Sequence, residues 1–103
     1  MAIRRLVATY GRAIESKDLV LFRSVKPNLT ADEERRLQQG FRAVTSQRVQ
    51  LTIASVDRRG DTATVVVQRR DELDVGGRRQ TVEARQVLTL GRTRDSWVIV
   101  EIR

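Results

Sequence analysis

The chain has 103 residues, of which 40% are hydrophobic, so it is long enough to bury one core and too short for two domains. It contains no cysteine and no histidine, which excludes thiol nucleophiles, imidazole bases, redox pairs and the usual zinc ligand sets. The net charge of +7 comes from 18 arginines and two lysines against 13 acids, and so strong an arginine bias reflects the composition of the source as readily as a nucleic-acid partner. No apolar run has the length of a membrane span, and arginines interrupt the N-terminal segment where a signal peptide would be unbroken, so we expect a cytoplasmic protein with no membrane contact.

The first 44 residues predict three helices. An amphipathic helix over residues 2–16 is indicated by apolar residues at helical spacing: Ile3, Leu6, Val7, Tyr10 and Ile14. Asp18 is a suitable N-cap for a short second helix or single turn, which ends before Pro27 because a residue that precedes proline avoids helical geometry. Thr30 and Glu33 have the spacing of a capping box and predict a third helix over residues 31–44.

From Ser46 onward the hydrophobic period changes to two, and valine, isoleucine, threonine and leucine predominate. Three turn segments, "RRGD", "VGGR" and "GRTRDS", divide this region. It therefore predicts four antiparallel strands joined by three hairpins, over residues 47–57, 61–74, 79–91 and 96–103.

Loop lengths fix the predicted registers. A two-residue loop at Gly76-Gly77, typical of turns that need positive φ, pairs Asp74 with Arg79 and Arg70 with Glu83. A three-residue loop over residues 58–60 places the apolar residues of the first strand on the same face as those of the second, whereas a two-residue loop would separate them, so we expect the longer loop.

In the last hairpin, a loop of even length pairs Trp97 with Leu90 and Ile99 with Leu88, which directs Trp97 toward the helices; an odd length would turn Val98 and its neighbours inward instead. We favour an inward Trp97 because the largest apolar side chain should be covered. The inner face then becomes polar toward the second hairpin, which indicates either the mouth of a pocket or a sheet that extends past its helices into solvent.

Three helices followed by a curling meander that ends in "WVIVEI" resemble the nuclear transport factor 2-like superfamily, which includes the SnoaL-like and ketosteroid-isomerase-like proteins. The resemblance rests on that final strand and on "IRRLVATYGRAIESKDLVLF" at the start, and it covers nearly the whole chain. It implies a single α+β domain over residues 1–103, with three N-terminal helices packed on a curved, cone-like, four-stranded antiparallel sheet. The segment between Phe22 and Thr30 has no room for an extra strand pair that many members contain, which implies a reduced version with a smaller pocket.

Members that are enzymes use a carboxylate on the concave face, opposed by tyrosine or acid donors. The corresponding candidates lining a pocket in this chain are Tyr10, Arg69, Asp71, Gln86 and Glu101. Asp71 would act as a base if burial raised its pKa; alternatively it pairs with Arg69, and Tyr10 packs in the core. In "DELD", strand alternation sends Asp71 to one face and Glu72 and Asp74 to the other, so we expect no metal site, and no cofactor is implied.

The outer face of the predicted sheet carries an apolar strip that the chain itself does not cover: Val66, Val87, Val98, Val100 and Ile102. A second copy or a neighbouring domain is the expected occupant. Arginines at the hairpin tips alternate with acids, and no exposed aromatic residues are evident, so we do not expect nucleic-acid binding.

These patterns lead to two hypotheses. The first is a non-enzymatic interaction or dimerisation module, as in the accessory or sensory domain of a larger bacterial signalling protein. The second is a domain that binds a small apolar ligand, or a residual isomerase-like or cyclase-like enzyme, using the inner face. A cavity of roughly 300 Å³ or more at the candidate residues would favour the second hypothesis, and a filled interior the first.

Overall fold

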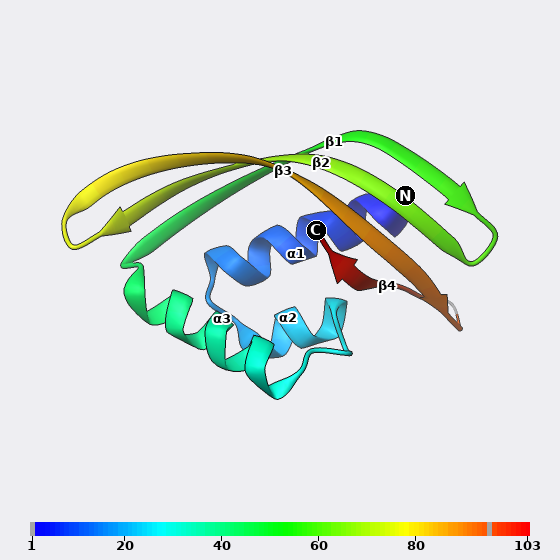
Figure 1. The fold of residues 1–103 in the computed structure, drawn as a ribbon, viewed down its shortest axis with the longest axis horizontal. Coiled ribbons are helices and arrows are strands. Elements are labelled where there is room, and N and C mark those ends of the chain that lie inside the picture. Colours follow the sequence, from blue (N-terminus) through cyan, green and yellow to red (C-terminus); the bar gives the residue numbers. More distant parts are fainter. Residues whose placement is uncertain (1, 95) are drawn as a thin grey trace.

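The computed structural model describes residues 2–94 and 96–103 and confirms the predicted α+β architecture. Three helices, α1 (Ala2–Glu15), α2 (Leu19–Val25) and α3 (Ala31–Ala43), precede four strands, β1 (Ser46–Arg59), β2 (Thr62–Val75), β3 (Arg78–Thr93) and β4 (Ser96–Ile102). The strands form one antiparallel sheet in the order β1-β2-β3-β4. The sheet curves, and all three helices lie on its concave side (Figure 1).

Capping hydrogen bonds from nearby side chains define the N-termini of the second and third helices. The Asp18 carboxylate accepts a hydrogen bond of 3.0 Å from the Leu21 N–H at the start of α2. At the start of α3, Thr30 Oγ1 accepts from the Glu33 N–H at 3.1 Å, and a Glu33 carboxylate oxygen accepts from the Thr30 N–H at 3.0 Å. The predicted capping box is therefore confirmed. Within the described residues, no helix is both long and apolar enough to span a membrane.

The central hairpin has the predicted register. Asp74 pairs with Arg79 and Arg70 with Glu83 across β2 and β3. Gly76 and Gly77 form the loop, and their φ angles of +57° and +81° lie in the left-handed region that favours glycine.

The loop of the first hairpin was predicted wrongly. Arg59 pairs with Thr62, so the turn contains two residues, Gly60 and Asp61, and not the three residues 58–60. A bulge between Ile53 and Ser55 inserts one extra residue into β1. Because the bulge shifts the alternation by one, the apolar residues of β1 still face the helices, although Ile53 pairs with Val67 and not with Val65.

The register of the last hairpin was also predicted wrongly, although Trp97 does face the core. Trp97 pairs with Arg92 and Ile99 with Leu90, one row away from the predicted partners. Asp95, part of the predicted "GRTRDS" turn, lies outside the described residues.

A second bulge, at Val100, reverses the faces at the end of β4. Ile102, predicted on the outer face, pairs with Leu88 and packs against the core. Glu101, predicted on the inner face, is exposed and forms an ion pair of 3.1 Å with Arg103. Both assignments are corrected because the bulge adds one residue between Ile99 and Glu101.

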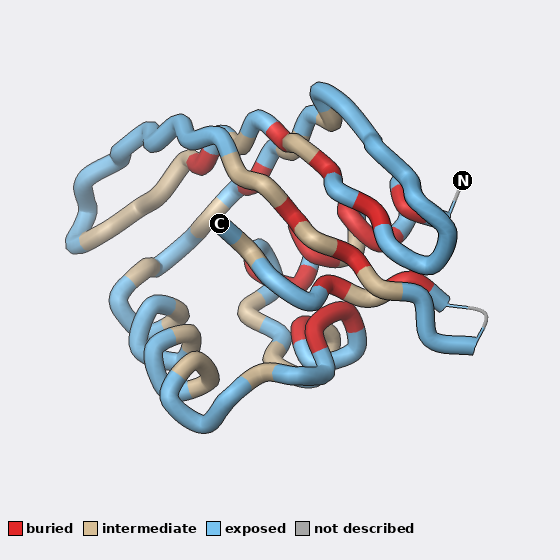
Figure 2. The backbone as a smooth tube through the Cα atoms, turned by 45° about the vertical axis from the view of Figure 1, so that its right-hand side comes forward, coloured by how far each residue is buried: buried red, intermediate tan, exposed pale blue. Residues whose placement is uncertain are grey.

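The core occupies only part of the sheet. Its largest fully buried side chains lie on the inner face of β2, β3 and β4: Val65, Val67, Leu88, Leu90 and Ile99. They pack with α1 and α2, whereas α3 contains no buried residue. In Figure 2 the buried segments gather at this end, and the β2–β3 hairpin extends beyond them, largely exposed. The inner face is consequently less covered toward that hairpin, and Tyr10, Arg69, Asp71 and Gln86 lie where the buried core ends.

Candidate functional site

A cluster of five hydrogen-bonded side chains lies on the inner face where the core ends. Tyr10 comes from α1, Gln47 from β1, Arg69 and Asp71 from β2, and Gln86 from β3. Arg69 and Asp71 share a face because they are two residues apart on one strand, and Gln86 reaches the same face because it pairs with buried Val67. We call these five residues the polar cluster.

Arg69 is the centre of the polar cluster. Its Nε donates to Asp71 Oδ1 and its Nη2 donates to Asp71 Oδ2, each at 2.7 Å. Its Nη1 donates to the Tyr10 hydroxyl at 3.0 Å, and that hydroxyl donates to Gln86 Oε1 at 3.1 Å. Gln47 Nε2 donates to Asp71 Oδ2 at 2.7 Å. The result is a continuous chain of bonds from β1 to β3 that passes beneath α1.

Burial and charge shift the pKa values of three members. Burial raises the pKa of the Tyr10 hydroxyl, although the Arg69 charge and the hydrogen bonds that the hydroxyl makes with Gln86 and Arg69 oppose it. Burial by itself would raise the pKa of Asp71, but the hydrogen bonds and charge of Arg69, together with the bond from Gln47, outweigh it and lower that pKa. Burial likewise opposes the charge of Arg69, whose pKa is nevertheless raised by its bonds to Asp71.

These shifts determine what the polar cluster can do chemically. A general base is most effective when its pKa lies near the working pH, whereas Asp71 has a lowered pKa and accepts three hydrogen bonds. The Tyr10 proton is already donated to Gln86. The arrangement is therefore suited to holding charge and geometry rather than to moving a proton.

The structure brings together four of the five residues predicted to line a pocket, and excludes Glu101. Gln47 was missed. Extending the predicted pairing of the first two strands by one more row would have placed Gln47 opposite Asp71. In the structure the two are diagonal neighbours, since Val49 pairs with Asp71 and Gln47 with Leu73.

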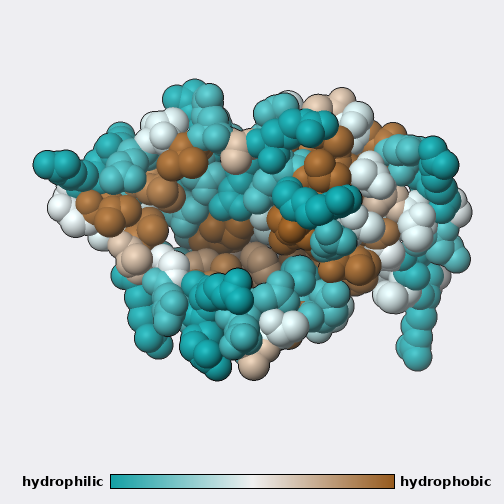
Figure 3. Space-filling model, in the orientation of Figure 1, coloured by the Kyte–Doolittle hydropathy of each residue, from teal (hydrophilic) through white to brown (hydrophobic). Residues whose placement is uncertain are grey.

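Beside the polar cluster lies a cavity of about 280 Å³ between α3 and the sheet. Its wall is largely apolar, with contributions from Ile14, Phe22, Leu37, Phe41, Val44 and Leu73. Tyr10, Gln47 and Arg69 close one side of it, and Arg36 of α3 lies at its edge. Figure 3 shows the hollow between sheet and helices, lined by hydrophobic residues and surrounded by hydrophilic ones.

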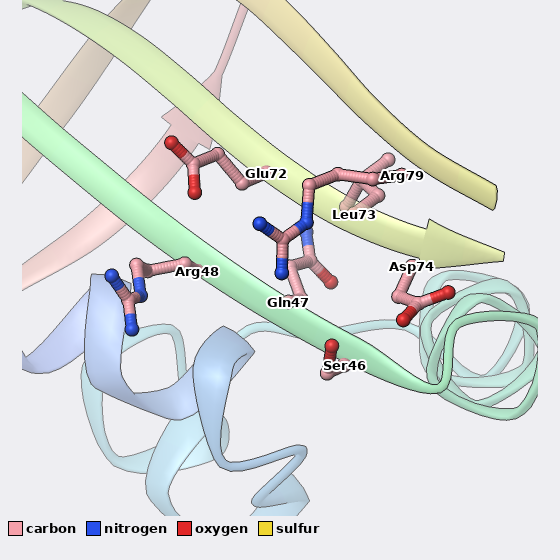
Figure 4. Close-up of a pocket in the computed structure, with 7 residues that line it drawn as sticks. All are labelled: Ser46, Gln47, Arg48, Glu72, Leu73, Asp74 and Arg79. Carbon is pink, nitrogen blue, oxygen red and sulfur yellow. The ribbon is translucent and has the colours of Figure 1, made fainter. Parts of the chain in front are cut away.

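The acids of "DELD" separate as strand alternation predicts. Asp71 is buried on the inner face, while Glu72 and Asp74 line a shallow outer pocket of about 210 Å³ with Arg48 and Arg79. Figure 4 shows Glu72 and Asp74 directed away from each other on either side of the Arg79 guanidinium. Two charges of each sign balance in this pocket, whose remaining lining residues are Ser46, Gln47 and Leu73.

At the opposite end of the sheet, arginines of two hairpins flank the indole of Trp97. The guanidinium carbons of Arg58 and Arg92 lie 5.2 Å and 6.0 Å from the ring centre. Trp97 itself is buried, so it offers no exposed ring on which a base would stack.

Comparison with known proteins gives structural matches only. No protein-family model matches the sequence, and no curated protein matches it. Among solved structures, the chain is similar to the Kfla4162 protein from Kribbella flavida (TM-score 0.88, 20% identity, covering 99% of this chain and 86% of that one). It is similar to a nuclear transport factor 2-like superfamily protein from Salmonella enterica (TM-score 0.85, 12% identity, covering 98% and 85%).

A third similar structure comes from Thiobacillus denitrificans and is provisionally named a calcium/calmodulin-dependent protein kinase type II association domain (TM-score 0.80, 16% identity, covering 97% and 90%). At identities this low, the likeness establishes the fold and leaves function to be argued from the site. The order of elements, the concave sheet and these matches together show that the chain has the nuclear transport factor 2-like fold.

Proposed function

We propose that the chain is a non-catalytic domain that binds a small amphipathic molecule in the inner-face cavity. The observation that carries this proposal is the position of Arg69, whose side chain lines an otherwise largely apolar cavity of about 280 Å³. That volume is just below the range of roughly 300–1,000 Å³ typical of ligand pockets, which suits a small ligand. The ligand would place an apolar body against α3 and a polar end against Arg69.

The hydrogen-bonding capacity of Arg69 indicates the polar end of the ligand. A guanidinium has five N–H donors, and three are used, two by Asp71 and one by Tyr10. The remaining two have no partner among the described residues and need acceptor atoms. Asp71 already balances the charge of Arg69, but Arg36 adds a further positive charge at the cavity edge. A carboxylate is therefore a better match than an alcohol, and a cation is a poor one.

A binding role fits the polar cluster better than an enzymatic role. Asp71 is held ionised by Arg69 and Gln47, and the Tyr10 proton is committed to Gln86. With no histidine or cysteine in the chain, no other side chain at the cavity serves as a base or nucleophile near neutral pH.

The test is a thermal-shift series with three probes of equal chain length: octanoate, octanol and octylammonium. We expect octanoate to raise the melting temperature most and octylammonium least. Gly40→Leu should abolish the shift, because a side chain at Gly40 has free space and enters the cavity that this residue lines. Gln38→Leu, an exposed change on the same helix, is the matched control. Equal shifts for all three probes, or an unchanged octanoate shift in Gly40→Leu, would refute the proposal.

A second candidate function is self-association through the outer sheet face. Charges of opposite sign sit beside each other there, as in the pairs Arg48–Glu72, Asp74–Arg79 and Arg70–Glu83. In a chain of net charge +7, a face with balanced charges allows a second copy to approach with little repulsion. A neighbouring domain of a larger bacterial signalling protein is the alternative occupant, and the kinase association domain similar in fold makes that role reasonable.

A further inference from the structure

A second groove lies away from the inner-face cavity, between α1 and β1. It measures about 550 Å³. Leu51 and Ile53 of β1 form one wall, and Val7, Ala8, Arg4 and Arg12 of α1 form the other. Leu51 and Ile53 are only partly buried, so the sheet presents apolar side chains at this edge that the helix does not cover completely.

β1 is an edge strand. It pairs with β2 on one side, and no other described strand pairs with it. On an edge strand, every second residue directs its N–H and C=O groups away from the sheet. Another strand can form hydrogen bonds with these groups. The bulge between Ile53 and Ser55 interrupts this edge, so regular pairing is limited to the part of β1 before the bulge, next to the groove.

The groove carries positive charge. Arg4, Ala8 and Arg12 follow one another at four-residue spacing on the side of α1 that faces it. Neither arginine forms an ion pair with a carboxylate of the described residues. Glu15 is the only acid that lines the groove among the residues described.

From this combination we infer that the groove binds an acidic, extended segment of another protein, which adds to the sheet as a strand beside β1. Its main chain would bond to the free edge of β1, and alternate apolar side chains would pack on Leu51, Ile53 and Ala8. Because alternate residues of a strand face the same side, acids two residues before and after these apolar side chains would also point toward α1 and meet Arg4 and Arg12. A second copy of this chain is a poorer occupant, because two strongly basic chains would meet along an edge that carries arginine.

The probes are two labelled seven-residue peptides, Glu-Thr-Val-Thr-Val-Thr-Glu and its counterpart with lysine in place of both glutamates, and binding is measured by fluorescence anisotropy. We expect the acidic peptide to bind and the basic one not to bind. The double variant Arg4→Glu with Arg12→Glu should weaken binding at least about tenfold, which corresponds to about 1.4 kcal/mol. Arg42→Glu with Arg78→Glu, both exposed and outside the groove, changes the net charge equally and should have a much smaller effect.

A further pair of peptides tests strand addition itself. N-methylation of only the valines, or only the threonines, removes N–H groups from one of the two alternating sets. Because only one set faces β1 in an added strand, one methylated peptide should lose binding and the other should keep it. The inference is overturned if both methylated peptides bind equally, if the basic peptide binds as tightly as the acidic one, if the two double variants are equally impaired, or if light scattering shows that the groove variant dissociates a dimer of the chain.

Discussion

Arg69 and Asp71, two residues apart on β2, face each other as a planar fork with two hydrogen bonds of 2.7 Å. Both side chains are largely buried, with 17% and 9% of their surface exposed. The pair sits at the boundary between the apolar core and the open end of the sheet. It therefore allows a charged group to lie against the core.

Asp71→Asn should destabilise the fold by roughly 2 to 4 kcal/mol, because it leaves the Arg69 charge buried without a counter-ion. Urea unfolding at neutral pH measures this difference. The matched control is Asp57→Asn, which removes an exposed partner of Arg59 and should change the free energy of unfolding by less than about 0.5 kcal/mol. Similar losses in the two variants would contradict a special role for the buried pair.

The same pair sets a pH dependence. The pKa of Asp71 is lowered in the folded state from its ordinary value of 3.8, so its contribution to stability is complete above that pH and is lost as the pH falls toward the folded pKa. The difference in unfolding free energy between the native chain and Asp71→Asn should therefore be constant near neutrality and shrink below about pH 4. A difference that grows with acid would show that the pair is not formed.

The fold was predictable because its signals are local and repeated. The capping box at Thr30 and Glu33 and the glycine pair at residues 76–77 each specify one backbone geometry, and the structure contains both. Alternation placed Arg69, Asp71 and Gln86 on the inner face correctly, and helical spacing placed Tyr10 on the buried side of α1. The prediction requires only that the face of the sheet on which each side chain lies is known. An error of two residues in the register leaves that face unchanged.

The two bulges were not predictable in this way. A bulge adds one residue to a strand, and no particular residue type marks its position. The sequence around Ala54 and around Val100 has the composition of an ordinary strand. The bulge at Val100 reversed the predicted faces of Glu101 and Ile102, and thus removed one candidate from each proposed surface. The cavity could not be predicted from the sequence either. Its volume depends on how closely α3 packs against the sheet, and the periodicity of hydrophobic residues gives no information on that distance.

Tyr10→Phe tests the other half of the polar cluster. It removes the bond to Gln86 and leaves one Arg69 donor without its acceptor, so we expect a loss of about 1 to 2 kcal/mol in urea unfolding. Because the folded pKa of Tyr10 is raised, the folded chain keeps its proton above pH 10 while the unfolded chain releases it, and stability should fall with rising pH there. This alkaline decline should be smaller in the Phe variant.

Tyr10 is the only tyrosine in the chain, so tyrosinate absorbance follows its titration directly. We expect the midpoint in the folded protein to lie above that of the unfolded protein in urea. Arg42→Gln changes an exposed residue away from the polar cluster and should not change the titration midpoint of Tyr10. A folded midpoint at or below the unfolded one would contradict the burial of this hydroxyl.

Gly77→Val tests the central hairpin. Gly77 has a φ of +81°, and a β-branched residue resists that conformation, so we expect a loss on the order of 1 to 2 kcal/mol in thermal or urea unfolding. Gly40→Ala is the contrasting change, because Gly40 is helical and a Cβ there has no atom within 4 Å. It should stabilise the chain by about 0.5 to 1 kcal/mol. Unchanged stability of Gly77→Val would mean that the turn has a different conformation in solution.

The last prediction concerns self-association through the outer sheet face, where the structure changes the predicted apolar strip. Val66 and Val87 pair across β2 and β3 as one unit. Val98 pairs with Gly91, and Val100, with 45% of its surface exposed, packs over the same glycine as a second unit. The pair Thr89 and Glu101 lies between the two units, and Ile102 has moved to the core. Any dimer formed here is consequently weaker than a continuous strip would give.

Burying several hundred Å² of this face per copy, at about 25 cal/mol per Å², still offsets the cost of association if the balanced charges beside the valines also pair. Light scattering at high micromolar concentration should then show a dimer, and Val87→Lys with Val100→Lys should yield a folded monomer. Val20→Lys with Val82→Lys is the matched control, since both valines are exposed away from this face and the charge added is the same. If the native chain is a monomer at that concentration, the face binds a different partner or none. If the control variant dissociates the dimer as completely, added charge and not the loss of this contact is responsible, and the interface lies elsewhere.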